Sequence, residues 1–567
     1  MRPLSHLAAL AVLLLNACYP AGDGKPPPLE ELYFPTGLAF DDPKQLNPAS
    51  TKAPNYLYVV NSDFDLQYRS ASVISYDLAK LRDAVPRNCN PETDCGAGMK
   101  CDVDGVEVMT SAGVVKQAPT YYCVDESNPQ PCQYGFRDEA DLVLYPGRCQ
   151  PIESETAKAT LVAGTVGIGA FATDVIWRQD KASGKQRLFI PVRGDSTLHW
   201  IDVEPQGQLE CGQKTSEDGN CDDEHRSGDV GADNLDNLKQ PQEPYAIDTS
   251  SSGEYVAITN QTQGSVSLFR NDWGARDDAV KLVNILSGLP VAPVAISALP
   301  KPAYSNADVA AQAADGFLVA YRSAAQIDLL RVRDAGPNPG GNPNNYDRYV
   351  LQRTGSVPIN ANSLGFDSRG ITIDDEQRRK DYAKCDQGNI GDDCKAATDP
   401  LQCCYRAVHQ PSVYVASRAP ASLLVGAMTA DPNYLSGTSE LPSFTDSLAL
   451  TFGPSRVIVG DVRVAGSASS AQHDDAGPFE LERRIFVVCF DSRRIFVYDP
   501  KRRAIEAIVS TGRGPYALAV DGARGLAYLG HFTDSYLGVI SLDQRFPQTY
   551  AAIVASIGTP KAPRTSK

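Results

Sequence analysis

An all-β fold is predicted by two observations near the end of the chain. Residues 483–558 form a run of short segments rich in Val, Ile, Phe and Tyr, each ended by Asp, Gly or Pro, a composition typical of strands separated by tight turns. The pattern of segments in residues 485–510 is also repeated, in the same order, in residues 515–557. A four-stranded unit cannot bury both of its faces alone, so this repetition predicts blades stacked into a β-propeller.

Seven hairpins extend the repeat over the chain. Their inner strands read LYVVN (57–61), FIPVR (189–193), VAITN (256–260), LVAYR (318–322), VYVAS (413–417), FVVCF (486–490) and AYLGH (527–531). Successive starts differ by between 41 residues (486 to 527) and 132 residues (57 to 189), so the excess over one bare blade must be insertions. We predict a seven-bladed propeller over residues 33–558, with six or eight blades and a two-domain β-sandwich as alternatives.

Several of these units resemble the YVTN-type repeats of bacterial β-propellers. The likeness is carried by LYVVNSD (57–63), ASVISYD (71–77) and GPYALAVDGARGLAY (514–528). It implies a ring fold for most of the chain. The family is defined by its architecture, so the resemblance implies no particular chemistry.

The amino terminus predicts an exported protein that is held at a membrane. Residues 1–17 contain the apolar run LAALAVLLL (7–15), which is too short to span a bilayer but suits a secretory signal. The run leads into Leu-Asn-Ala-Cys (15–18), which resembles the lipobox of bacterial lipoproteins. This implies a lipid on Cys18, a tether over residues 18–32 and an outer-membrane location facing the periplasm or the cell surface, because Tyr19 stands where Asp would retain the protein in the inner membrane.

The charge balance excludes one class of partner. The chain has 53 Lys and Arg against 69 Asp and Glu, a formal net charge of -16. Such a surface repels phosphate backbones, so nucleic acid is not an expected partner. Residues 559–567 are expected to form only a short tail.

The cysteines predict disulfides. Six lie in an insertion over residues 88–150, two bracket an acidic loop and four precede the fifth hairpin: Cys89, Cys95, Cys101, Cys123, Cys132, Cys149, Cys211, Cys221, Cys385, Cys394, Cys403 and Cys404. Even groups in an exported chain are typical of disulfides, whose pairing the sequence leaves open. Zinc is the alternative, but the first three are six residues apart and no His lies in the insertion. Cys489 is expected to be a buried structural thiol.

No complete catalytic motif is present: the sequence lacks G-x-S-x-G, H-E-x-x-H, a Walker loop and C-x-x-C-H. We therefore predict no catalytic residue and no resident metal or cofactor, with calcium left open for the acidic residues 217–236. A cluster of arginines and a lysine over residues 483–503 is expected to lie in water at hairpin ends.

Two weaker groups of residues are candidates for a site. Repeat symmetry places the last residue of each inner strand on one face of the ring: Asn61, Arg193, Asn260, Arg322, Ser417, Phe490 and His531. Carboxylates end several opening strands: Asp41, Asp374, Asp461 and Asp521. Resemblance to lactonase-like propellers implies that such carboxylates hold a divalent cation near the axis, but ordinary turn chemistry is the favoured explanation.

The sequence thus favours a lipid-anchored envelope protein that binds or scaffolds other molecules, either envelope proteins or polysaccharide, and performs no chemistry. The alternative is a metal-dependent hydrolase of the lactonase type with its site at the axis. A third hypothesis makes the cysteine-rich insertion the adhesive part and the propeller its support.

Overall fold

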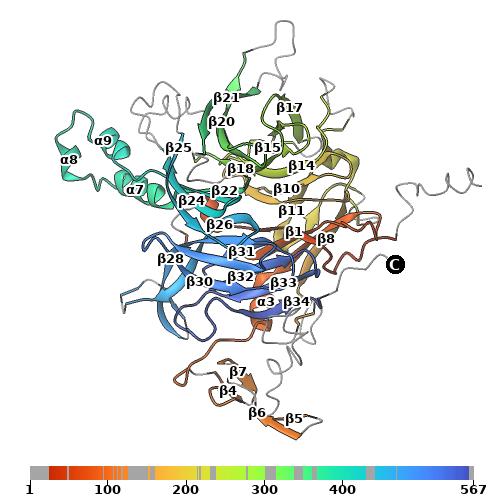
Figure 1. The fold of residues 1–567 in the computed structure, drawn as a ribbon, viewed down its shortest axis with the longest axis vertical. Helices are drawn as coiled ribbons and strands as arrows, with labels where there is room; N and C mark the ends of the chain where they lie inside the picture. The colour runs from red at the N-terminus through yellow and green to blue at the C-terminus, as the bar shows by residue number, and fades with distance from the viewer. Residues whose placement is uncertain are drawn as a thin grey trace, which may run out of the picture.

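Seven antiparallel sheets of four or five strands follow one another along the chain (Figure 1). The computed structural model describes residues 25–46, 50–93, 95–105, 107–110, 113–116, 119, 121–125, 151–153, 160–213, 215, 219–229, 238–275, 279–300, 315–336, 349–359, 367–428, 441–467, 469–470, 472–474 and 476–560. No helix within these ranges is long and apolar enough to cross a membrane.

Each blade has four main strands that are consecutive in the chain, apart from insertions. The opening strands are β1 (Pro35–Phe40), β9 (Ile176–Gln179), β14 (Pro244–Thr249), β18 (Pro293–Ala298), β22 (Ser368–Asp374), β26 (Pro454–Ala465) and β31 (Pro515–Asp521). The second strands are β2 (Tyr56–Asn61), β10 (Gln186–Val192), β15 (Tyr255–Asn260), β19 (Gly316–Tyr321), β23 (Ser412–Arg418), β28 (Gly477–Cys489) and β32 (Leu526–His531).

The outer half of each blade is built in the same way. The third strands are β3 (Ala71–Asp77), β11 (Thr197–Val203), β16 (Ser265–Asn271), β20 (Gln326–Asp334), β24 (Ala421–Met428), β29 (Arg494–Asp499) and β33 (Tyr536–Ser541). The fourth strands are β8 (Val162–Ile168), β12 (Leu209–Glu210), β17 (Val280–Leu286), β21 (Tyr349–Pro358), β25 (Pro442–Ala449), β30 (Ala504–Ser510) and β34 (Ile553–Ile557). Two short strands, β13 (Arg226–Ser227) and β27 (Gln472–Asp474), pair with β11 and β28.

The seven blades close into a ring. Each opening strand contacts the opening strand of the next blade, and β31 contacts β1, so these strands line the axis. Seven buried apolar clusters occupy the seven interfaces between neighbouring blades. The predicted seven-bladed β-propeller is therefore confirmed, and the core lies between blades because neither face of a single sheet can be left in water.

Closure of the ring depends on contacts between the two ends of the chain, since the first and last blades share no main strand. A cluster of buried side chains from both blades fills this interface. Chain returning from the insertion after β3 adds a bridge to the outer edge of the last blade: the Ile152 amide donates to Ser556 (2.7 Å), and the Gly558 amide donates to Ile152 (2.8 Å).

The two faces of the ring differ. The hairpin face, as we name it, carries the turns between second and third strands and the connections between blades. The insertion face carries the loops after first and third strands. In six blades the pairing of the opening strand shifts register within its first residues, next to the hairpin face. Such bulges re-aim side chains, and here they serve residues at the axis.

Glycine is required where opening strands approach most closely. A Cβ on Gly370 of β22 would lie 2.9 Å from the Val457 amide nitrogen and 3.0 Å from the Arg456 Cα of the next blade. A Cβ on Gly37 of β1 would lie 2.9 Å from the backbone of residues 174 and 175. These contacts give a physical reason for the glycine two residues after the start of the repeat.

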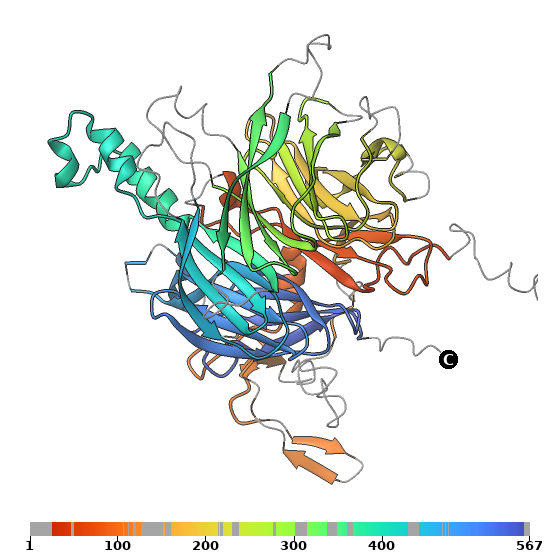
Figure 2. The ribbon, with the colours of Figure 1, turned by 45° about the horizontal axis from the view of Figure 1, so that its top comes forward.

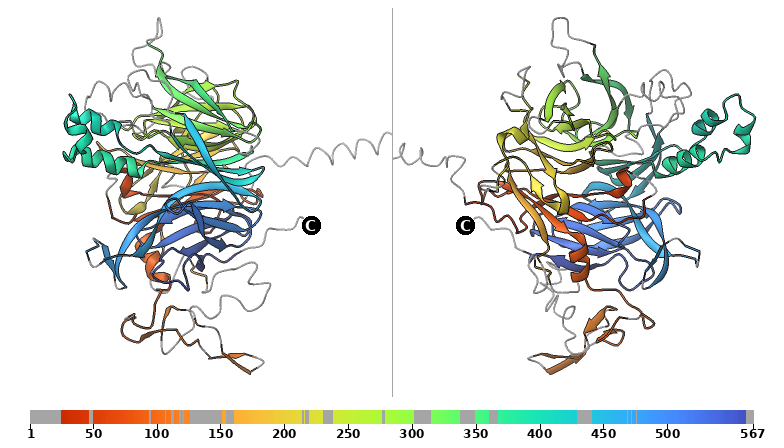
Figure 3. Two further views of the ribbon diagram at one scale, coloured as in Figure 1. Left: turned by 60° about the vertical axis from the view of Figure 1, so that its left-hand side comes forward. Right: turned by 180° about the vertical axis from the view of Figure 1, so that it is seen from behind.

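Two insertions extend from the ring (Figures 1 and 2). The knob follows β3 and contains α3 (Leu78–Ala84), β4 (Met99–Cys101), β5 (Glu107–Thr110), β6 (Gly113–Lys116) and β7 (Cys123–Asp125). The arm follows β22 and contains α7 (Glu376–Asp386), α8 (Asp392–Lys395) and α9 (Pro400–Arg406), and Figure 3 shows it standing clear of the sheets. The arm was not expected from the sequence.

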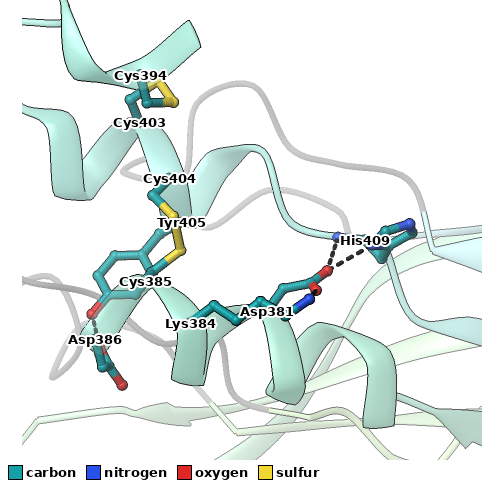
Figure 4. The surroundings of a disulfide bond; sticks show 9 residues. All are labelled: Asp381, Lys384, Cys385, Asp386, Cys394, Cys403, Cys404, Tyr405 and His409. Atoms are coloured by element: carbon teal, nitrogen blue, oxygen red, sulfur yellow. Dashed lines mark hydrogen bonds and ion pairs between the residues drawn. A yellow bond between two sulfur atoms is a disulfide. The ribbon is translucent and has the colours of Figure 1, made fainter. Parts of the chain in front are cut away.

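The arm is held by disulfides and a few buried side chains. Cys385 pairs with Cys404 and Cys394 with Cys403 (Figure 4). Its small core adds Tyr382, whose ring centroid lies 5.6 Å from that of Tyr405. A short helical segment of mostly charged residues is unstable alone, so these cross-links supply most of the order of the arm.

Candidate functional site

Two interactions cross the axis of the ring. Arg456 of β26 donates from Nη1 to both carboxylate oxygens of Asp174, at 3.0 and 3.1 Å, joining the sixth blade to the connection that enters the second. The same guanidinium donates from Nη2 to the Thr36 carbonyl oxygen at 3.4 Å. The hydroxyl oxygens of Tyr245 and Tyr516, from the third and seventh blades, lie 3.1 Å apart. These contacts close the axis with a polar layer.

The ion pair in this layer is largely withdrawn from water. Burial raises the pKa of Asp174, and the Arg456 charge only partly opposes that shift. Burial also acts to lower the pKa of Arg456, but the Asp174 carboxylate more than offsets it, so the pKa of Arg456 lies above its ordinary value. The Arg456 guanidinium also lies 4.6 Å from the ring centroid of Tyr516, a favourable cation–π distance.

Aromatic rings cover the axis on the hairpin face. The phenylalanine cluster consists of Phe34, Phe64, Phe171, Phe490 and Phe532, whose neighbouring ring centroids are 5.2 to 6.5 Å apart. Tyr516 joins it to the polar layer, at 6.1 Å from Phe532. The cluster draws on loops of the first, sixth and seventh blades and on the connection into the second. Sequence reasoning noted only Phe490, because the other rings lie in loops whose convergence depends on the closed ring.

A cavity of about 440 Å³ lies at the axis on the insertion face. It is lined by the ends of β1, β9, β26 and β31 and by α2 (Pro43–Leu46). Its main cations already face carboxylates: Lys44 pairs with Asp461, and Arg178 Nη2 lies 3.2 Å from Asp248. Burial lowers the pKa of Arg178. The cavity can hold a small polar ligand that would compete with these ion pairs.

Two of the predicted axial carboxylates cap turns. Asp41 accepts hydrogen bonds from the amides of Asn55 and Tyr56, both at 2.7 Å. Asp521 accepts from the Arg524 amide at 3.1 Å and from Arg524 Nη1 at 2.8 Å. Their backbone and cation contacts are those of ordinary turn residues.

The other two predicted carboxylates share one cation. Arg483 of β28 places Nη1 3.0 Å from Asp461 and Nε 3.4 Å from Asp374, and it also pairs with Glu376. Burial lowers the pKa of Arg483. Within the described ranges the four predicted carboxylates form no group of three metal donors.

One such group lies elsewhere, in the second blade. Donor atoms of Asp202, Glu210 and His225 lie within 4.8 Å of one another. Asp202 also accepts a hydrogen bond from Arg187 Nε at 2.7 Å, and the His225 ring centroid lies 3.8 Å from that of Trp200. A set containing imidazole suits zinc better than calcium. Part of the acidic segment 217–236, for which calcium was left open, lies outside the described residues.

The hairpin-end residues do share one face, as repeat symmetry predicts. Strand pairing places Asn61, Asn260 and His531 opposite the first residues of their opening strands. All three are fully buried. Asn61 accepts from the Tyr33 amide (3.1 Å) and donates to Ser72 Oγ (3.0 Å), and Asn260 is hydrogen bonded in a similar way. These amides organise the hairpins from within.

The remaining hairpin-end residues differ in exposure. His531 stacks on Tyr536 with ring centroids 4.0 Å apart, and burial lowers its pKa to about 3. Ser417 is buried, and Phe490 belongs to the phenylalanine cluster. Arg193 and Arg322 reach the surface, where Arg193 pairs with Glu243 at 2.6 Å. Ligand binding by this face stays a prediction.

The predicted disulfides form wherever both cysteines are described. The pairs are Cys89–Cys101, Cys95–Cys123, Cys211–Cys221, Cys385–Cys404 and Cys394–Cys403. Cys18, Cys132 and Cys149 lie outside the described residues. Cys489 is buried, and burial raises the pKa of its thiol to about 11, consistent with an inert structural role.

The expectation that residues 483–503 carry water-exposed cations at hairpin ends is wrong for Arg483 and Arg484. Arg483 lies in β28 beside the axial cavity, with its side chain 20% exposed. Arg484 follows it in the same strand. Its side chain is only 1% exposed, with Nη2 2.7 Å from Glu506 and 3.1 Å from Glu482. Pairing of β28 with β26 and β29 places this arginine inside a blade rather than at a hairpin end. Lys501, Arg502 and Arg503 are exposed as expected.

Comparison with known proteins gives no family. No protein-family model and no curated protein matches the chain. Among solved structures it is similar to hydrazine synthase of Kuenenia stuttgartiensis (TM-score 0.40, 9% identity, covering 92% of this chain and 99% of that one). It is also similar to a 6-phosphogluconolactonase, so described provisionally, of Bacteroides fragilis (0.39, 11%, 68% and 84%) and to the periplasmic gluconolactonase of Pseudomonas aeruginosa (0.37, 11%, 85% and 86%). Similarity at these identities and TM-scores says nothing about the activity of this chain, and the seven sheets themselves establish its fold.

Proposed function

We propose that this protein is a lipid-anchored, non-catalytic binding or scaffold protein of the bacterial cell envelope, with YVTN-type propeller repeats. Cys18 is the proposed lipid attachment site, and the outer membrane is the proposed location. The proposed partners are envelope proteins or polysaccharide, met on the insertion face.

The observation that carries this proposal is the state of the axis. Where a propeller enzyme would hold its metal, Asp174 is bound by Arg456 and Asp461 by Lys44 and Arg483. Recruiting Asp174 to a metal would leave the Arg456 guanidinium without its carboxylate, which costs several kcal/mol. Recruiting Asp461 would take a carboxylate from Lys44 and from Arg483. The knob and the arm, by contrast, project from the insertion face and enlarge the surface there.

The cavity keeps the alternative, a metal-dependent lactonase-like hydrolase, open to test, because Asp42, Asp461 and Asp521 line it. The protein from Tyr19 to Lys567 would be treated with chelator and titrated calorimetrically with calcium, zinc and manganese. We expect that any metal binding by the unaltered protein is kept in Asp461→Asn, and that gluconolactone is not hydrolysed. Binding at micromolar metal that is lost in Asp461→Asn, together with lactone hydrolysis, would establish the enzyme instead.

A matched variant separates the axis from the second blade. Glu210→Gln alters the group formed by Asp202, Glu210 and His225, and it leaves every residue of the axial cavity in place. Metal binding lost in Glu210→Gln and kept in Asp461→Asn would locate a metal in the second blade, away from the axis, and would leave the binding role intact.

The partner surface can be tested by cross-linking from defined positions in envelope preparations. A photoreactive residue at Lys395, which is exposed on α8 of the arm, is expected to capture a partner reproducibly. The same group at Arg322, on the hairpin face, should not capture that partner. Capture from Arg322 alone would contradict the assignment of the partner to the insertion face.

A further inference from the structure

Exposed apolar side chains gather on the hairpin face. Among the described residues six large apolar side chains are exposed, and four of them lie in loops of this face: Phe64 (52%), Leu66 (61%), Val291 (59%) and Phe452 (68%). The other two are Met99 in the knob and Ile508 on the outer strand of the sixth blade. Single exposed apolar residues are ordinary, but here four of the six lie on one face, which also carries an aromatic centre.

The phenylalanine cluster is open on its outer side. Phe64 lies against Phe34, Phe171 and Phe532, at centroid distances of 6.2, 6.0 and 5.2 Å, and still leaves half of its side chain uncovered. Its neighbour Leu66 shares the turn between β2 and β3. This turn therefore presents apolar groups outward, supported from beneath by packed rings.

Some of the charged groups around this centre are matched in pairs, whereas Asp65, Arg493 and Arg494 on the same face are exposed and form no ion pair among the described residues. Arg513 Nη2 lies 2.6 Å from Asp534, and Arg418 pairs with Asp491. Arg193 pairs with Glu243 at its edge. Such paired charges can approach a headgroup region without leaving a buried charge unmatched.

The chain reaches the ring at the same face. Lys25 forms a bridge with Tyr68, and the Arg69 amide donates to the Lys25 carbonyl at 3.0 Å, beside the turn that carries Phe64 and Leu66. Cys18 precedes Lys25 by seven residues. Seven residues span at most about 25 Å when fully extended. A lipid on Cys18 would thus hold this face close to the bilayer.

We propose that the hairpin face is a membrane seat: it rests on the bilayer surface, with Phe64, Leu66, Val291 and Phe452 among the lipid headgroups. The proposal rests on the proposed lipid attachment of Cys18 for its orientation. Its consequence is that the knob, the arm and the mouth of the axial cavity point away from the membrane, where a partner can reach them.

The test uses protein without a lipid, so that it reports on the face alone. The chain from Tyr19 to Lys567, which retains every described residue, would be sedimented with phosphatidylcholine vesicles at millimolar lipid. We expect it to bind, and the double variant Phe64→Ser/Phe452→Ser to bind about tenfold more weakly, because two half-exposed side chains of this size lose their transfer into the interface.

Ile508→Ser is the matched control, since it removes an exposed apolar side chain remote from the seat. It should bind vesicles like the unaltered protein, and melting temperatures would confirm that all three proteins are folded. Absent vesicle binding, or equal binding by the folded double variant, would overturn the proposal. So would a dimer in solution that the double variant dissociates, since the face would then bind a second copy.

Failure of the lipid attachment is measured separately. The mass of the amino-terminal peptide from protein made in cells shows whether Cys18 is acylated. An unmodified Cys18 contradicts the proposed anchor, whereas the vesicle measurement is unaffected because its protein never carried a lipid.

Discussion

The axial ion pair gives the sharpest test of the structure. Arg456→Met removes the guanidinium that binds Asp174 and keeps an apolar side chain over Tyr516. Breaking a buried ion pair by removing one partner typically costs 3–5 kcal/mol, because the other charge stays buried. The side chains of Arg456 and Asp174 are 24% and 17% exposed, so some water screening remains. We therefore expect a loss of about 2–3 kcal/mol of unfolding free energy.

The measurement is urea unfolding followed by tryptophan fluorescence, with Trp177 of β9 reporting on the blade entered through Asp174. Arg456→Met, Asp174→Asn and the double variant form a cycle. The double variant should be more stable than the sum of the two losses predicts, by about 1–3 kcal/mol, because it leaves no charge unpaired. Arg322→Met, which removes an exposed cation near the same face, should cost less than about 0.5 kcal/mol.

The pH dependence of Arg456→Met follows from the same pair. Burial already raises the pKa of Asp174, and removing the nearby positive charge would raise it further. A carboxyl with a raised pKa in the folded state favours folding more as the pH falls, so the variant should regain stability in acid. A loss below about 0.5 kcal/mol, or a cycle whose losses simply add, would refute the structural role given to this pair.

Three further predictions follow from single features. Burial raises the pKa of Asp63 from 3.8 to about 7, so the stability of the fold should fall as the pH rises between these values. The melting temperature of Asp63→Asn should equal that of the unaltered protein near pH 4 and exceed it at pH 8. Equal melting temperatures at both pH values would contradict this. Burial lowers the pKa of His531 from 6.5 to about 3, so stability should fall as the pH drops below 6.5, and a His531→Phe variant showing the same acid loss would count against this account. Reduction should expose the arm and the knob to protease before the ring, because a bridge such as Cys385–Cys404 contributes about 3 kcal/mol; simultaneous cleavage everywhere, identified by mass spectrometry, would argue otherwise.

The sequence determined the blades because the signals that form them are local. Alternating Val, Ile and Tyr with Gly and Asp turns specify a hairpin within about twenty residues, and seven such hairpins were recognised. Even cysteine groups, in a chain expected to be exported, likewise predicted disulfides, although their pairing needed the three-dimensional structure. The arm escaped prediction because α7 has a largely charged sequence without an apolar face, and its order comes from Cys385–Cys404 and Cys394–Cys403.

The site depended on the closed ring. In the sequence Asp461 was predicted to be a turn residue, with metal binding as the weaker alternative, and only the fold brings Lys44, 417 residues away, against it. Asp174 and Arg456 are 282 residues apart and neither belongs to a sequence motif, yet together they join opposite sides of the axis. The phenylalanine cluster likewise collects five rings from the first, sixth and seventh blades and from the connection into the second. Local sequence determines which strands and turns form. Which charged residues meet at the axis depends on how all seven blades close into the ring, and no local sequence pattern predicts that.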